Sequence, residues 1–99
     1  MTKIIRWGIL GTGNIAGSFA QGLKDLPDIE LRAVGSRTEK TARDFSERFT
    51  IPNHYASYEA LVSDPDIDVI YISTPHPMHV ENTILCLNAG KHVLCEKPF

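Results

Sequence analysis

The residues near the start of the chain that are best suited to chemistry form a glycine-rich turn. Gly11, Gly13 and Ala16 fit the pattern G-x-G-x-x-A, between an apolar run and a segment with helical spacing. In such a turn the first glycine permits a tight bend, the second lets the backbone approach a pyrophosphate, and the alanine lets the helix pack close to the strand. The phosphates then lie at the positive end of the helix. We therefore expect cofactor-binding residues here: Gly11, Thr12, Gly13, Asn14 and Ile15.

A glycine pattern of this kind is weak by itself, and its strand–turn–helix context makes it more specific. Two alternatives stay open at this point. The turn could be an ordinary glycine-containing connection between a strand and a helix. It could also hold a mononucleotide or adenosylmethionine, because the same architecture hosts several ligands.

Ser36 and Arg37 follow the second apolar run, at the position where NAD-binding sheets usually carry an acidic residue. The first carboxylate after this run is Glu39. A carboxylate would repel a 2′-phosphate, whereas a hydroxyl and a guanidinium would bind one. The sequence therefore predicts that NADP(H) is preferred over NAD(H). The alternative is that Ser36 and Glu39 form a capping box and Arg37 is a solvated surface residue.

Thr74, His76 and His79 lie just after a later apolar run, in the segment TPHPMH. Residues at the carboxyl ends of parallel strands face the ligand crevice, so we expect all three to contact the cofactor. His76 precedes a proline suited to the first helical position, and it could instead cap the helix. Two histidines without a nearby cysteine or acidic partner are too few for a metal site, so we expect no metal.

The segment Glu96-Lys97-Pro98 directly follows the last apolar run. At this edge of the sheet, Lys97 could donate a proton to a substrate oxygen, and we predict that it is the catalytic residue. Glu96 is predicted as a further cofactor contact. The alternative is a polar loop, which is the more common role of such a segment.

Alternating strands and helices must bring these residues together. Apolar, β-branched runs predict five strands: 3–10, 29–35, a very short one near 54–55, 68–73 and 92–95. Helical spacing and capping residues predict four helices: from Asn14 to before Pro27, Thr38–Phe49, from a Ser57 cap through Val62, and one that carries Val80, Ile84 and Leu87 and is capped by Gly90. Such alternation predicts an α/β fold, a Rossmann-type open parallel sheet with helices on both faces, truncated after the fifth strand.

Composition argues against several classes of protein. The hydrophobic share is 42%, the charged share 22% and the net charge −2, with basic residues scattered along the chain. We therefore expect no nucleic-acid partner and no membrane association, and we find no apolar run long enough for a bilayer span or a secretory signal. The spacing of Cys86 and Cys95 fits neither a CxxC redox motif nor a zinc site. Buried, reduced thiols in a cytoplasmic protein are the expectation.

In combination, these segments resemble the Gfo/Idh/MocA oxidoreductases over the whole chain. The resemblance is carried by the following segments: Trp7–Ala16, Ser36-Arg37, Thr74-Pro75, and Ala89–Val93 running into Glu96-Lys97-Pro98. Residues 74–99 look closest to the dihydrodiol and xylose dehydrogenase branch. Most relatives carry asparagine where this chain has His76, and that branch accounts for the departure.

The resemblance implies NADP(H) and a small-molecule polyol or carbonyl substrate. It also implies that Lys97 acts in substrate binding and catalysis, that Arg37 meets the 2′-phosphate, and that His76 and His79 help to position the coenzyme. Family members continue for a few hundred residues past Glu-Lys-Pro. We therefore expect residues 1–99 to be an incomplete NAD(P)-binding domain, inactive alone, from a homo-oligomeric dehydrogenase.

Two other functions occur on this fold. A non-catalytic nucleotide sensor has no need of a lysine in the crevice, so Lys97 argues against it. A nicotinamide-dependent glycosidase tends to hold NAD, so Ser36 and Arg37 argue mildly against that alternative.

Overall fold

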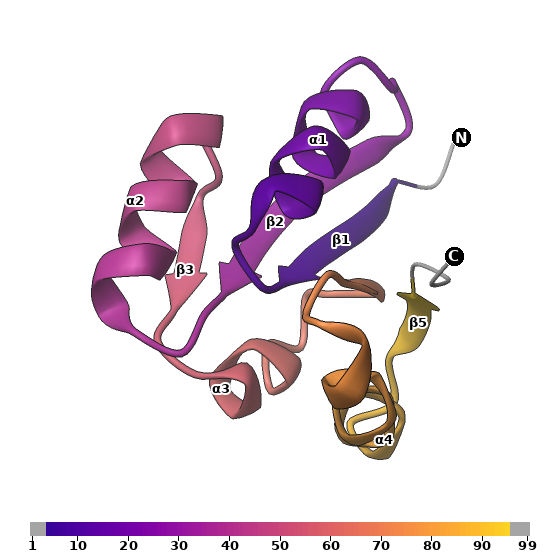
Figure 1. Ribbon diagram of the computed structural model, residues 1–99. Helices are drawn as coiled ribbons and strands as arrows, with labels where there is room; N and C mark the ends of the chain where they lie inside the picture. Colours follow the sequence, from indigo (N-terminus) through magenta and orange to yellow (C-terminus); the bar gives the residue numbers. More distant parts are fainter. Residues whose placement is uncertain (1–3, 96–99) are drawn as a thin grey trace.

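The computed structural model describes residues 4–95, except for the side chain of His76. Strands and helices alternate along the chain as the sequence predicts (Figure 1): β1 (Ile5–Leu10), α1 (Asn14–Leu23), β2 (Ile29–Gly35), α2 (Glu39–Phe49), β3 (Asn53–Tyr55), α3 (Tyr58–Val62), β4 (Val69–Ile72), the 3-10 turn η1 (His76–Met78), α4 (His79–Asn88) and β5 (His92–Cys95). The predicted bounds differ from these by a few residues, as is usual at element ends. Within residues 4–95, no helix is long and apolar enough to cross a membrane.

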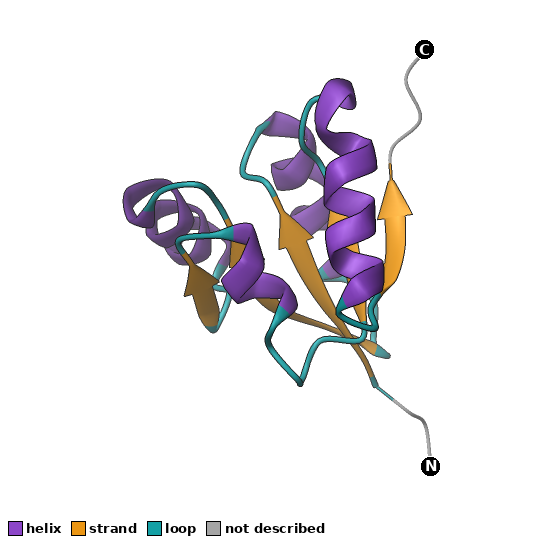
Figure 2. Cartoon of the chain, turned by 90° about the horizontal axis from the view of Figure 1, so that it is seen from below, coloured by secondary structure: helices purple, strands orange, loops and turns teal. Residues whose placement is uncertain are grey.

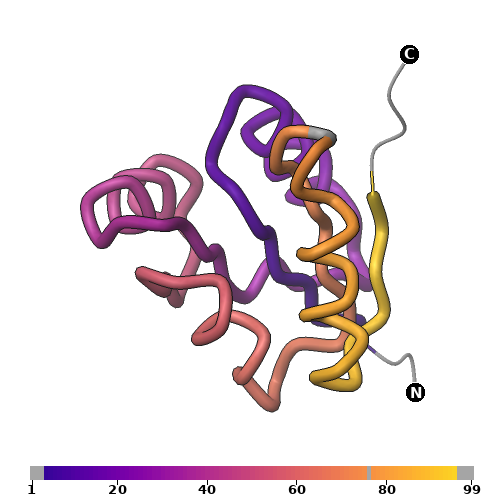
Figure 3. Tube along the Cα trace, turned by 60° about the horizontal axis from the view of Figure 1, so that its bottom comes forward, coloured from indigo at the N-terminus to yellow at the C-terminus, as the bar shows by residue number. Residues whose placement is uncertain are grey.

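The five strands form one parallel sheet in the order β3-β2-β1-β4-β5 (Figure 2). The chain runs outward from β1 through β2 to β3 and then returns to β4 on the other side of β1. In Figure 3, β1 in indigo accordingly lies between α2 in magenta and α4 in orange. The predicted α/β class and parallel sheet are therefore confirmed.

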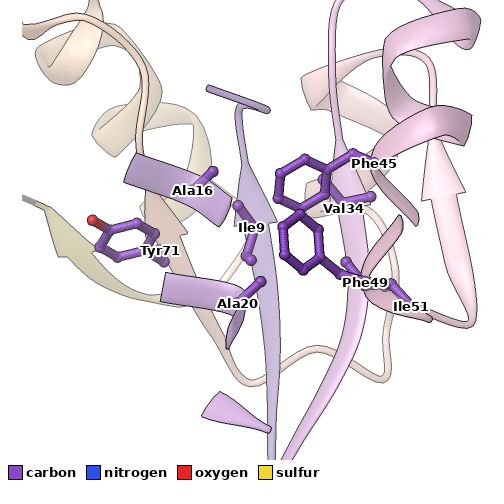
Figure 4. Close-up of a cluster of buried hydrophobic side chains, with 8 residues drawn as sticks. All are labelled: Ile9, Ala16, Ala20, Val34, Phe45, Phe49, Ile51 and Tyr71. Carbon is purple, nitrogen blue, oxygen red and sulfur yellow. The ribbon is translucent and has the colours of Figure 1, made fainter. Parts of the chain in front are cut away.

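Apolar side chains from the central strands point alternately to the two faces of the sheet, and each face has its own core. One core, shown in Figure 4, joins the strands to α1 and α2: Ile9, Ala16, Ala20, Val34, Phe45, Phe49, Ile51 and Tyr71. The other joins them to α3 and α4: Leu10, Ala33, Leu61, Val62, Ile67, Ile70, Ile72 and Cys86. Burial on both faces explains why the strands are nearly continuous apolar runs in the sequence.

The helix surfaces that are buried differ from the apolar rows that predicted the helices. In α1 the buried residues are Ala16, Ala20 and Leu23, and Ile15 is 56% exposed. The small alanines let the helix backbone approach the sheet, which turns Ile15 outward. In α4 the buried residues are Asn82 and Cys86. The apolar row on α4 is exposed: Val80, Ile84 and Leu87.

The structure corrects expectations about the residues that cap α2 and α4 and about the burial of Cys95, and it confirms the glycine that ends α4. The cap of α2 is Thr38, whose side chain accepts from the backbone N–H of Thr41, so Ser36 and Glu39 do not form a capping box. The residue before α4 is Met78, so His76 is not in the cap position of α4. Gly90 follows Ala89, the C-cap residue of α4, and has φ +80, as expected for a glycine that ends a helix. Of the two free cysteines, Cys86 is buried and Cys95 is only partly buried.

Candidate functional site

A cleft of about 770 Å³ opens at the carboxyl ends of β1, β2 and β4. The strand order reverses between β1 and β4, and ligands of open α/β sheets bind at such a switch point. The lining includes every predicted cofactor contact whose side chain is described: Gly11, Thr12, Gly13, Asn14, Ile15, Ser36, Arg37, Thr74 and His79. The fold therefore brings together residues that lie up to 68 positions apart in the sequence.

The two glycines of the first loop have different environments. Gly11 has φ +112, a conformation that L side chains rarely adopt, and its N–H donates to the carbonyl of Gly35 at 2.9 Å. Gly13 has φ −79, and a Cβ atom there would meet no heavy atom within 4 Å. Gly11 is therefore needed for the shape of the loop, whereas Gly13 leaves free space at the cleft.

The N-terminus of α1 is suited to an anion. Its cap residue is Gly13, which has no side chain to accept from the first amides, and the first turn holds no acidic residue. The unpaired amides and the positive helix end therefore keep their capacity for a phosphate oxygen. Asn14 and Ile15 belong to this turn and line the cleft. This position also accounts for the exposure of Ile15.

The end of β2 places hydroxyl groups and one cation in the cleft. Ser36 is only 6% exposed, and its Oγ lies 2.5 Å from Oγ1 of Thr41 and 3.4 Å from Oγ1 of Thr12. Arg37 is exposed, and no described residue in 4–95 pairs with its guanidinium. Thr38 and Thr41 also line the cleft, and our sequence analysis missed them as site residues. The only sequence signal for their role was their position two and five residues after Ser36, at the start of a helix.

Two hydrogen bonds join the end of β4 to α4. The buried hydroxyl of Thr74 donates to Oδ1 of Asn82 at 2.5 Å, and Nε2 of His79 donates to the carbonyl of Thr74 at 2.5 Å. A carbonyl only accepts, so the Nε2 atom of His79 carries a proton. The side chain of Thr74 thus anchors the start of α4, while its neighbours Ser73 and Pro75 and the ring of His79 face the cleft.

Three predicted site residues are not placed. Glu96 and Lys97 lie outside the described residues, and the same holds for the side chain of His76. Within the described part of the chain, no group of three or more His, Cys, Asp or Glu residues could hold a metal ion. The cleft of the described residues therefore offers glycine backbone, helix amides, hydroxyls and one guanidinium, a set of groups that suits phosphates.

Comparison with known proteins agrees with this geometry. The model of a family described as "Oxidoreductase family, NAD-binding Rossmann fold" matches residues 5–99. The trans-1,2-dihydrobenzene-1,2-diol dehydrogenase of Mus musculus is 48% identical over 96 residues, which cover 95% of this chain and 29% of that protein. The chain thus spans less than a third of that relative's length.

Solved structures of two oxidoreductases are also similar. KijD10, a 3-ketoreductase from Actinomadura kijaniata in complex with TDP-benzene and NADP, has 37% identity and a TM-score of 0.88, over 97% of this chain and 31% of that one. A scyllo-inositol dehydrogenase from Lactobacillus casei, with bound NAD(H) and scyllo-inositol, has 28% identity and a TM-score of 0.86, over 97% and 28%. Similar structures therefore include one with NADP and one with NAD(H).

Proposed function

The chain belongs to the Gfo/Idh/MocA oxidoreductase family, whose NAD-binding Rossmann fold matches its residues 5–99, and on this premise we propose that its cleft prefers NADP(H) to NAD(H). The observation that carries this preference is the end of β2. Ser36 and Arg37 line the cleft there, and no described lining residue is acidic. A 2′-phosphate would meet donors and a cation without a repelling carboxylate.

The first two carboxylates that follow β2 in the sequence are paired with other residues. Glu39, the first after β2, lies 2.8 Å from Nε2 of His54 on β3 and does not line the cleft. Asp44 accepts a hydrogen bond from Lys40 at 2.8 Å, and this bond lowers the pKa of the Asp44 carboxyl. Lys40 is thereby engaged on the outer side of α2. Arg37 is left as the cation of this region that faces the cleft.

The remaining cleft residues suit the rest of a dinucleotide. The open backbone at Gly13 and the first amides of α1 would hold the pyrophosphate. His79 would position the coenzyme at the end of β4, and we propose His76 and Glu96 as further coenzyme contacts. Bound nicotinamide supplies or accepts a hydride, and we propose a sugar, polyol or dihydrodiol-like compound as the substrate. The similarity to a dihydrodiol dehydrogenase and an inositol dehydrogenase supports this substrate class.

Titration with both coenzymes tests the preference, in the full-length protein and in the Arg37→Ala variant. Charge-assisted hydrogen bonds contribute roughly 1.5–3 kcal/mol, so the wild type should prefer NADP(H) by about tenfold or more. Arg37→Ala should lose most of this preference. Arg43→Ala is the matched control, because Arg43 is exposed on α2 and outside the cleft lining. Equal affinity of the wild type for both coenzymes, or an unchanged preference in Arg37→Ala, would contradict the proposal.

A further inference from the structure

A row of hydroxyl groups connects the start of α2 with the cleft. Oγ1 of Thr38 lies 2.7 Å from Oγ1 of Thr41, which lies 2.5 Å from Oγ of Ser36. Ser36 in turn lies 3.4 Å from Oγ1 of Thr12 in the loop after β1. All four residues line the cleft. The buried hydroxyl of Ser36 is therefore held by a neighbour five residues further along the chain.

One direction of donation along this row runs from Thr38 toward the cleft. The N–H of Thr41 donates to Oγ1 of Thr38 at 3.2 Å, so the Thr38 oxygen accepts there and keeps its own proton for another partner. Each hydroxyl has one proton. If Thr38 donates to Thr41, then Thr41 can donate to Ser36, and the proton of Ser36 remains available for Thr12 or for a ligand.

The opposite direction is also possible in the free protein. Thr41 then donates to the carbonyl of Thr38, at the longer distance of 3.3 Å, and Ser36 donates to Thr41. That arrangement uses the proton of Ser36 inside the protein. A phosphate is an acceptor only, so its presence favours the first direction, in which each hydroxyl polarises the next toward the anion.

We propose that Thr41 is a positioning residue for NADP selectivity. Its hydroxyl accepts from Thr38 and donates to Ser36, so that Ser36 donates to the 2′-phosphate while Thr41 itself does not contact that group. The inference rests on the proposed preference for NADP(H). Its physical basis is preorganisation, because a donor fixed before binding loses little conformational freedom when the ligand arrives.

Two nucleotide probes that differ only by the 2′-phosphate test the proposal: adenosine 2′,5′-bisphosphate and adenosine 5′-monophosphate. Their affinities are measured by calorimetry with the full-length wild type and with Thr41→Val, Thr41→Ser, Ser36→Ala and the Ser36→Ala/Thr41→Val double variant. Thr41→Val keeps the branched shape and removes the hydroxyl. It should lower the affinity for the bisphosphate about 3- to 10-fold, the usual effect of one hydrogen bond, and leave the affinity for the monophosphate unchanged. Thr41→Ser should bind like the wild type.

The double variant separates positioning from direct contact. If Thr41 acts through Ser36, the double variant binds the bisphosphate no more weakly than Ser36→Ala alone. Additive losses would show that Thr41 acts independently, and the inference would be wrong. If Thr41→Val also has a lower affinity for the monophosphate, the smaller variant Thr41→Ala is measured in its place, and the same outcomes decide.

The failure of this inference is distinct from failure of the proposed function. If Arg37→Ala lowers the preference for the bisphosphate and Thr41→Val does not, the inference is overturned and the proposed NADP(H) preference stands. If the wild type binds both probes equally, the proposed preference is overturned, and the role of Thr41 falls with it.

Discussion

A Cβ atom at Gly11 would lie 2.6 Å from the Oγ atom of Ser73. Ser73 is itself held in place, because this hydroxyl donates to the carbonyl of Leu10 at 3.1 Å. The first loop and the end of β4 are thus in contact at Gly11. Gly13, two residues later, has no such neighbour. The two glycines of one motif therefore act on different properties, the first on folding and the second on ligand binding.

We expect Gly13→Val to abolish coenzyme binding with little loss of stability. Its φ of −79 is open to any residue, so the side chain adds bulk where the pyrophosphate would lie. Gly11→Ala should instead lower the free energy of unfolding by roughly 1–3 kcal/mol, because its φ and its contact with Ser73 are both unfavourable for a side chain. Coenzyme titration and urea unfolding of both variants check this. Wild-type affinity in Gly13→Val would show that the phosphates bind elsewhere.

Lys97→Met in the full-length protein should reduce kcat by about 10²–10⁴ and leave coenzyme affinity intact. Hydride transfer to a carbonyl leaves negative charge on its oxygen, and a cation within hydrogen-bond reach stabilises that charge most in the transition state. Steady-state kinetics and coenzyme titration measure the two effects separately. Lys40→Met is the control, because Lys40 pairs with Asp44 on α2. A normal kcat with normal affinity would refute the catalytic role.

Lys91 is expected to stabilise the edge of the sheet opposite the cleft. It is 9% exposed, and its Nζ donates to the carbonyls of Asp64 at 2.6 Å and Ile67 at 2.8 Å, both before β4. Lys91→Met should lower the free energy of unfolding by about 2–4 kcal/mol, because two buried carbonyls lose a charged donor. The exposed Lys24→Met serves as the control. Equal thermal midpoints for wild type and Lys91→Met would contradict this role.

Stability should fall in alkaline solution partly because of Cys86. Burial, and to a lesser degree the nearby Cys95, raises the pKa of the Cys86 thiol from 9.0 to about 11. Below pH 9 the thiol is protonated in both the folded and the unfolded state, so its contribution to the free energy of unfolding is fully present. As the pH rises from 9 to 11, the unfolded chain releases this proton first, and the free energy of unfolding decreases. Urea unfolding across this range should give a shallower decline for Cys86→Ala; parallel curves would disprove the effect.

The 99-residue chain should self-associate at high concentration. Val80, Ile84 and Leu87 are 70%, 53% and 57% exposed and follow one another at helical spacing along α4. Contiguous apolar surface of this kind favours association in water. Ile84→Glu should shift light scattering toward the monomer, whereas Lys40→Glu on α2 should not. A monomeric wild type at every concentration, without binding of an apolar dye, would exclude this behaviour.

The sequence by itself determined the alternation of strands and helices, the parallel sheet and the shape of the first loop. Apolar periodicity, the need for crossovers between parallel strands and a glycine at position 11 that permits a tight turn are all local or topological properties. The position of the cleft follows from them, because the carboxyl ends of parallel strands meet at one edge. Nine of the predicted cofactor contacts line that cleft for this reason.

Only the tertiary structure decided which side chain meets which. Ile15 faces the cleft because Ala16 and Ala20 occupy the side of α1 that packs on the sheet. Glu39 is held by His54, fifteen residues away, because β3 lies beside α2. The contact of Thr41 with Ser36 likewise depends on how α2 leaves the sheet. Distances between separate elements depend on packing, and no local pattern in the sequence contains them.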